Sequence, residues 1–259
     1  MPVLGARPIS PEVILLLNDM RKDFRWARTR LQTFPKRKRI PIALKMLITA
    51  IIAIVIQFAL AIAGWGGWDA FFGHPALQAL AWVTAVLLAL SLFSGSSGLS
   101  TGVQEDRGNR WVLGAFSLIA MLITYFSSYT DRIGFWTLDG DTTRWFGVAV
   151  CAAGSVVRIL PVFVLKSRFS GLVAIQAGHR LETRGLYKVI RNPSYLGMLL
   201  SSLGWALAFR AGVGMILSMT LLIPIIPRIH SEEKLLCAHF GAEYDAYCAH
   251  TWRLIPGIY

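Results

Sequence analysis

The sequence predicts an all-α integral membrane protein with about six transmembrane helices. The chain of 259 residues is 55% hydrophobic and only 15% charged, with a mean hydropathy of +0.55, which is too apolar for a typical soluble domain. Its apolar residues also fall in long uninterrupted runs, and a bilayer core of about 30 Å needs roughly 20 such residues per helix. The polar residues collect between these runs and at both ends.

Residues 1–41 are predicted to form a basic cytosolic segment. They contain ten Lys and Arg residues, and Ser10 followed by Pro11 is typical of a helix start. Apolar residues then recur at alternating spacings of four and three, which places them on one helix face: Val13, Leu17, Met20, Phe24, Ala27 and Leu31. This amphipathic helix either lies on the inner membrane surface against anionic lipid or packs on the cytosolic part of the protein.

Residues 42–165 are predicted to form a membrane region of four spans, at 42–63, 76–93, 111–128 and 144–165. The loop 64–75 contains no Lys or Arg, and the loop 129–143 is acidic. The basic residues flank the opposite ends of the spans, so the positive-inside rule predicts that both termini and the polar segment after residue 165 are cytoplasmic. Arg158 lies inside the fourth span, where either snorkelling to the surface or a functional role would explain it.

Residues 166–259 combine a polar segment, two short spans and a polar tail. The spans, 194–209 and 212–227, are joined only by Arg210 and Ala211, so we expect a tight helical hairpin that either crosses the membrane or re-enters it. A cytosolic helix is expected to follow. Pro193 suits the first turn of the helix that begins at Ser194, so a positive helix end should face the cytosol. Such an end either binds an anionic group or is an ordinary helix start.

The tail places two acidic residues directly after the hairpin. Arg228 and Glu232 are four positions apart and therefore meet on one face of a helix. Glu232 and Glu233 are adjacent carboxylates in an otherwise basic region, where they could hold a cationic ligand. The alternative is a surface ion pair, which would contribute little to stability.

The polar segment and the tail together resemble the isoprenylcysteine carboxyl methyltransferase and phospholipid methyltransferase family of integral membrane enzymes. The resemblance covers roughly residues 150–259, and the order of its motifs around the hairpin is specific. The matching residues are His179, Leu181, Thr183, Gly185 and Tyr187, then Arg191-Asn192-Pro193-Ser194-Tyr195-Leu196-Gly197, and in the tail Arg228, Glu232, Glu233, Phe240, Gly241, Tyr244, Tyr247, Arg253 and Pro256.

The resemblance implies that S-adenosylmethionine is the methyl donor, bound at the cytosolic membrane face. It implies that the two glutamates engage the amino group of the cofactor and that Arg228 lies near the reacting methyl group, so that Arg228 and Glu232 would be catalytic. The residues implied to bind the cofactor are His179, Leu181, Gly185, Tyr187, Arg191, Asn192, Tyr195, Glu232 and Glu233.

Asn192 departs from the family pattern, which commonly has histidine at this position. Asparagine keeps a hydrogen-bond donor and an acceptor but does not titrate, so an acid–base role is not expected there. A carboxylate or thiolate acceptor would need a nearby cation such as Arg228. An amine acceptor would instead need its proton removed by a Glu or Tyr. The sequence leaves open whether the acceptor atom is oxygen, sulfur or nitrogen. The interfacial position suits a lipophilic or membrane-associated acceptor, and a small thiol or carboxyl compound stays open as the alternative.

Other classes of function fit the sequence less well. The three cysteines and five histidines lack the spacing of a disulfide framework or a metal site, and the basic residues flank spans without the exposed aromatics of a nucleic-acid surface. No signal peptide is evident. Two alternatives remain open. One is an NADPH-dependent membrane sterol or steroid reductase, which shares a similar C-terminal helical organisation. The other is a non-enzymatic membrane scaffold.

Overall fold

The computed structural model describes residues 42–93, 104–105, 111–165, 174–175 and 181–259. The predicted amphipathic segment 1–41 and His179 lie outside these ranges. Contacts divide the chain into residues 1–45 and residues 46–259. The second unit contains the helical bundle, apart from the first residues of its opening helix, which belong to the first unit.

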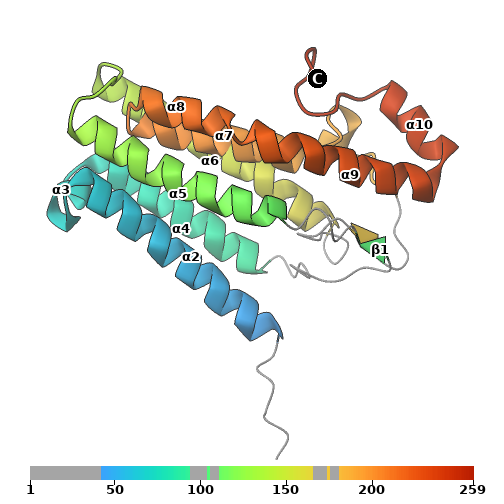
Figure 1. The fold of residues 1–259 in the computed structure, drawn as a ribbon, viewed down its shortest axis with the longest axis horizontal. Coiled ribbons are helices and arrows are strands. Elements are labelled where there is room, and N and C mark those ends of the chain that lie inside the picture. The colour runs from blue at the N-terminus through green and yellow to red at the C-terminus, as the bar shows by residue number, and fades with distance from the viewer. Residues whose placement is uncertain (1–41, 94–103, 106–110, 166–173, 176–180) are drawn as a thin grey trace, which may run out of the picture. The chain divides into compact units, whose positions relative to one another are not determined.

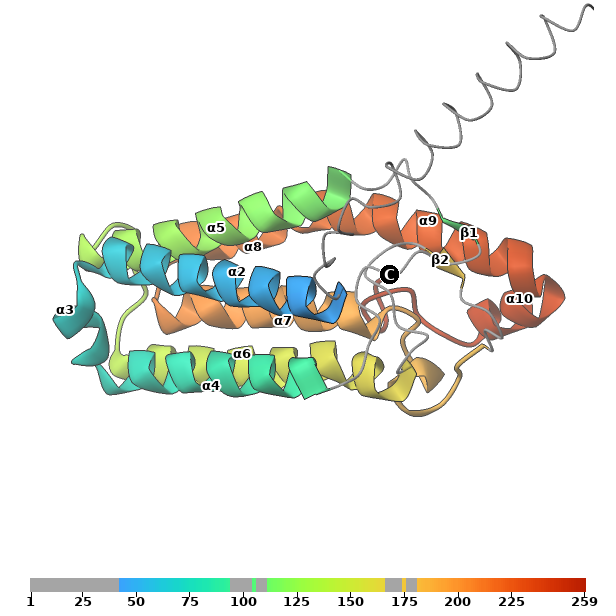
Figure 2. The ribbon, with the colours of Figure 1, turned by 90° about the horizontal axis from the view of Figure 1, so that it is seen from below.

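The fold of this unit is helical, as predicted, with one small strand pair among the described residues (Figures 1 and 2). The membrane region contains α2 (Ile42–Trp65), the short α3 (Trp68–Phe72), α4 (Pro75–Phe93), α5 (Trp111–Arg132) and α6 (Asp141–Leu165). The C-terminal region contains the 3₁₀ helix η3 (Gly185–Lys188), α7 (Pro193–Ala208), α8 (Gly212–Met219), α9 (Leu222–Phe240) and α10 (Ala242–Ala249).

Three of the described helical segments are long and apolar enough to cross a membrane. They are α5, α6 and the nearly continuous Gly212–Phe240, which joins α8 to α9. Shorter apolar stretches of α2 and α4 among the described residues are Ile51–Trp65 and Pro75–Leu87. The protein is therefore membrane-embedded, but the predicted number of six spans is not confirmed.

The hairpin near the C-terminus is present, and its second arm is longer than predicted. The chain turns at Phe209–Ala211 between α7 and α8, which pack against each other. The second arm was expected to end at residue 227, because Pro227 and the charged residues after it interrupt the apolar run. Pro227 instead lies inside α9, which continues to Phe240. Arg228 and Glu232 therefore extend from a long helix that also forms part of the bundle.

Glycine residues allow α6 and α7 to pack with their backbones almost in contact. A Cβ atom at Gly204 would overlap the backbone of Cys151, and one at Gly197 would overlap the backbone of Arg158. Gly147 and Gly154 of α6 face α7 backbone atoms in the same way. Membrane helices associate through this kind of small-residue contact because burial from lipid gives little hydrophobic driving force. The interface fixes the position of α7, whose first turn contains Tyr195.

The long helices run between two ends of the unit, which can be told apart in both views (Figures 1 and 2). The α3 end holds α3 and the α7–α8 turn, and the α10 end holds α10 and the strand pair. That pair joins β1 (Gln104–Glu105) to β2 (Ala174–Ile175) in antiparallel register. It brings the α4–α5 and α6–α7 connections together, and these two loops were predicted to share one side of the membrane.

Candidate functional site

The residues singled out in the polar segment and in the tail meet at the α10 end of the bundle. The chain from Val189 to Arg191 lies beside Trp252: the Arg191 amide donates to the Trp252 carbonyl at 2.8 Å, and the Trp252 amide donates to the Val189 carbonyl at 2.8 Å. The tail after α10 therefore returns to the start of α7. Two regions about sixty positions apart form one structural unit.

Tyr195, Arg228 and Glu232 form the inner part of this unit. The Tyr195 hydroxyl donates to Oε1 of Glu232 at 2.6 Å, and Nε of Arg228 donates to the Tyr195 oxygen at 2.7 Å and to the same Glu232 oxygen at 3.2 Å. Arg228 is buried, with 3% of its surface exposed, whereas 27% of the Glu232 side chain is accessible. No hydrogen bond within the described part of the chain uses Oε2 of Glu232. That oxygen can accept from a cationic ligand.

Glu233 faces a different set of partners, because adjacent helical residues point about 100° apart. Its Oε1 accepts from Nε of Arg191 at 3.0 Å, and its Oε2 accepts from Nε of Arg253 at 2.8 Å. Arg191 also donates to the carbonyl oxygens of Cys248 and Thr251. Each carboxylate oxygen of Glu233 thus has a charged partner. The Arg191–Glu233–Arg253 group, which we call the clamp, ties α9 to the polar segment and to the tail.

Asn192 joins the same contact between the polar segment and the tail. It occupies the N-cap position of α7, but its side chain makes no capping hydrogen bond. Its Nδ2 instead donates to the Arg253 carbonyl at 2.9 Å. Pro193 follows as the first residue of α7, as predicted. The position needs a hydrogen-bond donor for this contact, and asparagine supplies one without titrating.

The remaining predicted cofactor residues lie around η3. Gly185 begins η3 with a φ of +58°, a conformation that favours glycine, and a Cβ atom there would meet no neighbour within 4 Å. The carbonyl of Tyr187 accepts from the Tyr247 hydroxyl at 2.8 Å. Burial raises the pKa of Tyr247 to about 12, so this hydroxyl stays protonated and keeps donating. Leu181 is half-buried.

The structure thus separates two kinds of residue that the sequence grouped together. Tyr195, Arg228 and Glu232 form a charged and partly accessible cluster, whereas Arg191, Asn192 and Glu233 are engaged in holding elements together. The contributions of Thr251 and Trp252 were missed, because backbone carbonyl acceptors leave no signal in residue types. Arg253 was noted as a motif residue, but its pairing with Glu233 required the fold.

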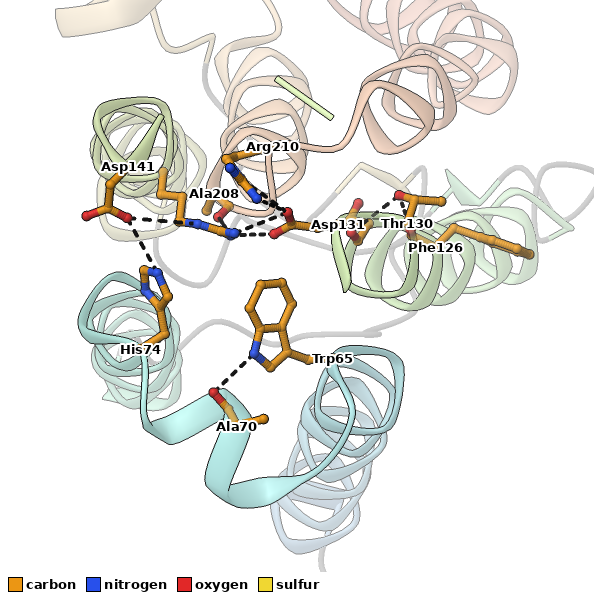
Figure 3. A network of polar contacts seen from close by, with 11 residues as sticks. Trp65, Ala70, His74, Phe126, Thr130, Asp131, Asp141, Ala208 and Arg210 are labelled. Carbon is orange, nitrogen blue, oxygen red and sulfur yellow. Dashed lines mark hydrogen bonds and ion pairs between the residues drawn. The ribbon is translucent and has the colours of Figure 1, made fainter. Parts of the chain in front are cut away.

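A second polar cluster was missed entirely and lies at the α3 end (Figure 3). Asp131, which is 4% exposed and was expected in a loop, lies in the last turn of α5. It accepts from Arg144 of α6 through both carboxylate oxygens, with Nη2 of Arg144 at 3.1 Å from Oδ1, and from Nη2 of Arg210 at 2.8 Å. Arg144 also donates to the Ala208 carbonyl at 3.1 Å. This cluster fixes the α7–α8 turn against α5 and α6.

A titratable residue, His74, lies at the border of this second cluster. Nε2 of His74 lies 3.4 Å from Oδ1 of Asp141, the first residue of α6. The guanidinium of Arg144 stacks 4.9 Å from the centre of the Trp65 ring. Burial and the nearby Arg144 cation lower the pKa of His74 below its usual value. In the described part of the chain no group of residues has the composition of a metal site.

Comparison with known proteins agrees with the resemblance drawn from the motifs. Residues 147–238 match the model of the isoprenylcysteine carboxyl methyltransferase family. A protein-S-isoprenylcysteine O-methyltransferase from Dictyostelium discoideum is 28% identical over 144 residues, which are 54% of this chain and 61% of the relative. A probable protein-S-isoprenylcysteine O-methyltransferase from Oryza sativa subsp. indica is 27% identical over 198 residues, covering 71% of this chain and 99% of the relative.

One solved structure is also similar. It is that of the eukaryotic intramembrane Ras methyltransferase, isoprenylcysteine carboxyl methyltransferase, determined without a monobody. The sequence identity is 18% and the TM-score 0.44, with 85% of this chain and 88% of the other covered.

Proposed function

We propose that this protein is a membrane methyltransferase that transfers a methyl group from S-adenosylmethionine to a lipophilic acceptor at the cytosolic membrane face, because residues 147–238 match the model of the isoprenylcysteine carboxyl methyltransferase family. The observation that carries the proposal is the Tyr195–Arg228–Glu232 cluster. It joins the start of α7 to α9 and includes a carboxylate oxygen open to a ligand. Helices that only cross the membrane would not require such a cluster of charged side chains.

The residues present fit a cofactor with cationic groups. Oε1 of Glu232 accepts from Tyr195 and Arg228, which holds the side chain in one orientation. Oε2 can then accept from the amino group of the cofactor. Arg228 compensates the charge of Glu232 in the absence of ligand and keeps the carboxylate in place. The clamp and Asn192 are proposed to hold the polar segment beside it.

The chemistry requires little beyond placement. When bound, S-adenosylmethionine supplies an electrophilic methyl group on a positively charged sulfur. A lone pair of the acceptor would take this methyl group, and the electrons of the broken bond would remain on the sulfur. Alignment of the two reactants near contact distance supplies much of the rate in such a displacement. We propose that the buried Arg228 cation also favours an anionic acceptor through its field.

The acceptor is proposed to be lipid-borne. The two relatives from Dictyostelium discoideum and Oryza sativa are named for action on isoprenylcysteine, in which a carboxylate sits beside a long apolar chain. The site lies where apolar helices meet polar loops, so the apolar part of such a molecule can remain in the bilayer while its polar end reaches Tyr195. A prenylated cysteine is therefore the first acceptor to test.

Calorimetric titration of the purified protein with S-adenosylmethionine and with NADPH tests the proposal. We expect binding of the former alone, and we expect Glu232→Gln to weaken it by at least tenfold. Glu243→Gln removes an exposed carboxylate from α10 and serves as the matched control. Binding of NADPH in place of S-adenosylmethionine would indicate a reductase. Binding of neither would support a scaffold and overturn the proposal.

A further inference from the structure

The tail folds back on itself after its clamp residue, in a segment of residues 254–259 that we call the hook. The Tyr259 carbonyl oxygen accepts from the amides of Leu254 and Ile255, at 2.7 Å and 2.9 Å. Gly257 turns the chain with a φ of +81°, a conformation that favours glycine. Leu254 is buried, and Tyr259 packs against the same hydrophobic core. The backbone of the hook therefore fixes where the Tyr259 side chain lies.

The Tyr259 side chain contacts both the tail and α9. Its hydroxyl oxygen accepts from Nη1 of Arg253 at 3.2 Å and lies 3.2 Å from Nε2 of His230 in α9. A hydroxyl has one donor and two acceptor sites, so it can accept from Arg253 and donate to His230 at the same time. The Arg253 guanidinium also lies over the Tyr259 ring, 5.1 Å from its centre. Tyr259 therefore holds Arg253 through its hydroxyl and through its ring.

These contacts close a ring of side chains that begins and ends on α9. His230 and Glu233 are three positions apart on this helix and are therefore neighbours on one of its faces. Nε of Arg253 donates to Oε2 of Glu233 at 2.8 Å, and Tyr259 connects Arg253 back to His230. Because the ring returns to the helix from which it starts, it restrains Arg253 more than a single ion pair would.

The two arginines of the clamp differ in how much they need such support. Arg191 has 9% of its side chain accessible, and it also donates to two carbonyl oxygens of the tail. The Arg253 side chain is 32% accessible. An exposed ion pair contributes little, because ordering two long side chains costs entropy, and Tyr259 lowers that cost by holding the guanidinium in place. The Arg253 carbonyl accepts from Asn192, so the position of Arg253 also affects where the polar segment meets the tail.

We propose that Tyr259 is a positioning residue, which keeps Arg253 on Glu233 and thereby keeps the polar segment and the tail closed against α9. This inference rests on the proposed function, because the closed arrangement is the one that would bind S-adenosylmethionine. It adds a residue beyond the motifs, which end at Pro256, to those on which the cofactor site depends. The alternative is that Tyr259 only buries apolar surface and contributes general stability.

Amide hydrogen exchange of the purified protein without ligand tests this inference. Tyr259→Phe keeps the ring and removes the hydroxyl. We expect the amides of Arg191 and Trp252, which join the polar segment to the tail, to exchange about tenfold faster in this variant. Amides of the bundle should exchange at the wild-type rate. Ile258→Ala, at a residue of the hook that is 78% exposed, is the matched control and should change neither rate.

A double-variant cycle shows whether Tyr259 acts through Arg253. Arg253→Gln should speed the same exchange, and adding Tyr259→Phe should have little further effect, because the hydroxyl would have no guanidinium to hold. Additive effects of the two substitutions would overturn the inference, and so would an unchanged exchange rate in Tyr259→Phe. Faster exchange throughout the bundle would also count against it, since Tyr259 would then contribute only general stability.

Cofactor binding separates this inference from the proposed function. We expect Tyr259→Phe to bind S-adenosylmethionine about threefold more weakly, because a smaller fraction of the protein is closed. Saturating cofactor should return exchange at Arg191 and Trp252 to the wild-type rate. Equal affinity in the wild type and in Tyr259→Phe would overturn the inference. If the wild type did not bind S-adenosylmethionine, the proposed function would fail, and the exchange rates would still decide whether Tyr259 holds Arg253.

Discussion

The hydroxyl of Tyr195 donates a 2.6 Å hydrogen bond to Oε1 of Glu232, and this contact connects the first turn of α7 to the middle of α9. The two residues are 37 positions apart, and the hairpin turn at Phe209–Ala211 brings them together. The orientation of Glu232 therefore depends on how α7 packs. A perturbation at the α6–α7 interface should reach the proposed cofactor site through this bond.

Replacing Tyr195 with phenylalanine removes that bond and leaves the ring in place. The Tyr195 ring lies 6.4 Å from the Phe116 ring, a contact that phenylalanine retains. Without the hydroxyl, Glu232 loses one of the two hydrogen-bond donors to its Oε1, so its side chain is held less firmly. We expect affinity for S-adenosylmethionine to fall about tenfold, with a loss of about 1 kcal/mol in stability. Calorimetry and thermal unfolding measure the two effects, and Tyr129→Phe at the α3 end is the control. If Tyr195→Phe bound S-adenosylmethionine as tightly as the wild type, Tyr195 would have no role in cofactor binding.

Glu232 and Glu233 should differ in what their glutamine variants lose. Both carboxylate oxygens of Glu233 pair with arginines of the clamp, so Glu233→Gln should cost about 2 kcal/mol of stability. Glu232→Gln should mainly weaken cofactor binding. Thermal unfolding without ligand measures the stability of each variant, and titration with S-adenosylmethionine then measures its affinity for the cofactor. If both variants lost affinity equally while unfolding at the wild-type temperature, the clamp would be part of the binding site.

The α6–α7 interface predicts a strong difference between two glycines. Gly204→Ala adds a methyl group against the backbone of Cys151 and should destabilise the protein by about 1–3 kcal/mol, since the helices must separate. Gly114→Ala in α5 meets no neighbour within 4 Å and should stabilise its helix by up to about 1 kcal/mol. Unfolding in detergent measures both. A neutral Gly204→Ala would mean that the helices are less closely packed than described.

The sequence predicted the helical membrane fold and brought the correct segments together for physical reasons. Apolar runs indicate helices directly, and Pro193 and Arg210-Ala211 mark a helix start and a turn. The extent of α9 was wrong, because a helix can continue through Pro227 and Arg228 when its next turns pack on other parts of the protein. A drop in hydropathy marks where the side chains stop being apolar. It does not mark where the backbone hydrogen bonds of the helix end, and α9 continues to Phe240. The close packing at Gly197 and Gly204 was equally hidden, since it depends on the facing residues of α6.

For the candidate site, residue types picked out carboxylates and arginines that the structure brings together, and the four-residue spacing of Arg228 and Glu232 predicted their pairing. The partners of Glu233 were not predicted, because only the rotation of α9 directs Glu232 to Tyr195 and Glu233 to the clamp. Asp131 and Arg144 were assigned to a loop and to a helix start. Nothing in the local sequence reveals that they meet across thirteen positions in a buried pair. Long-range pairs of this kind require the fold.

The lowered pKa of His74 predicts a pH dependence that originates at the α3 end. Burial is the main cause, and Arg144 and Arg210 add to it, whereas Asp141 and Asp131 oppose it. The folded state therefore prefers neutral His74, and the unfolded chain binds a proton more readily, near pH 6.5. Stability contributed by the neutral side chain is complete above that pH and is lost as the pH falls through the lower folded pKa.

We expect the unfolding temperature in detergent to fall between pH 7 and pH 5, and His74→Gln should reduce this fall. Glutamine keeps a hydrogen-bonding group near Asp141 without taking up a proton. His250→Gln, in the exposed residue after α10, is the matched control and should follow the wild type. An identical slope in His74→Gln would assign the pH dependence to other groups. A rise in stability on acidification, absent in the variant, would mean that the ion pair of protonated His74 with Asp141 outweighs burial and the Arg144 cation.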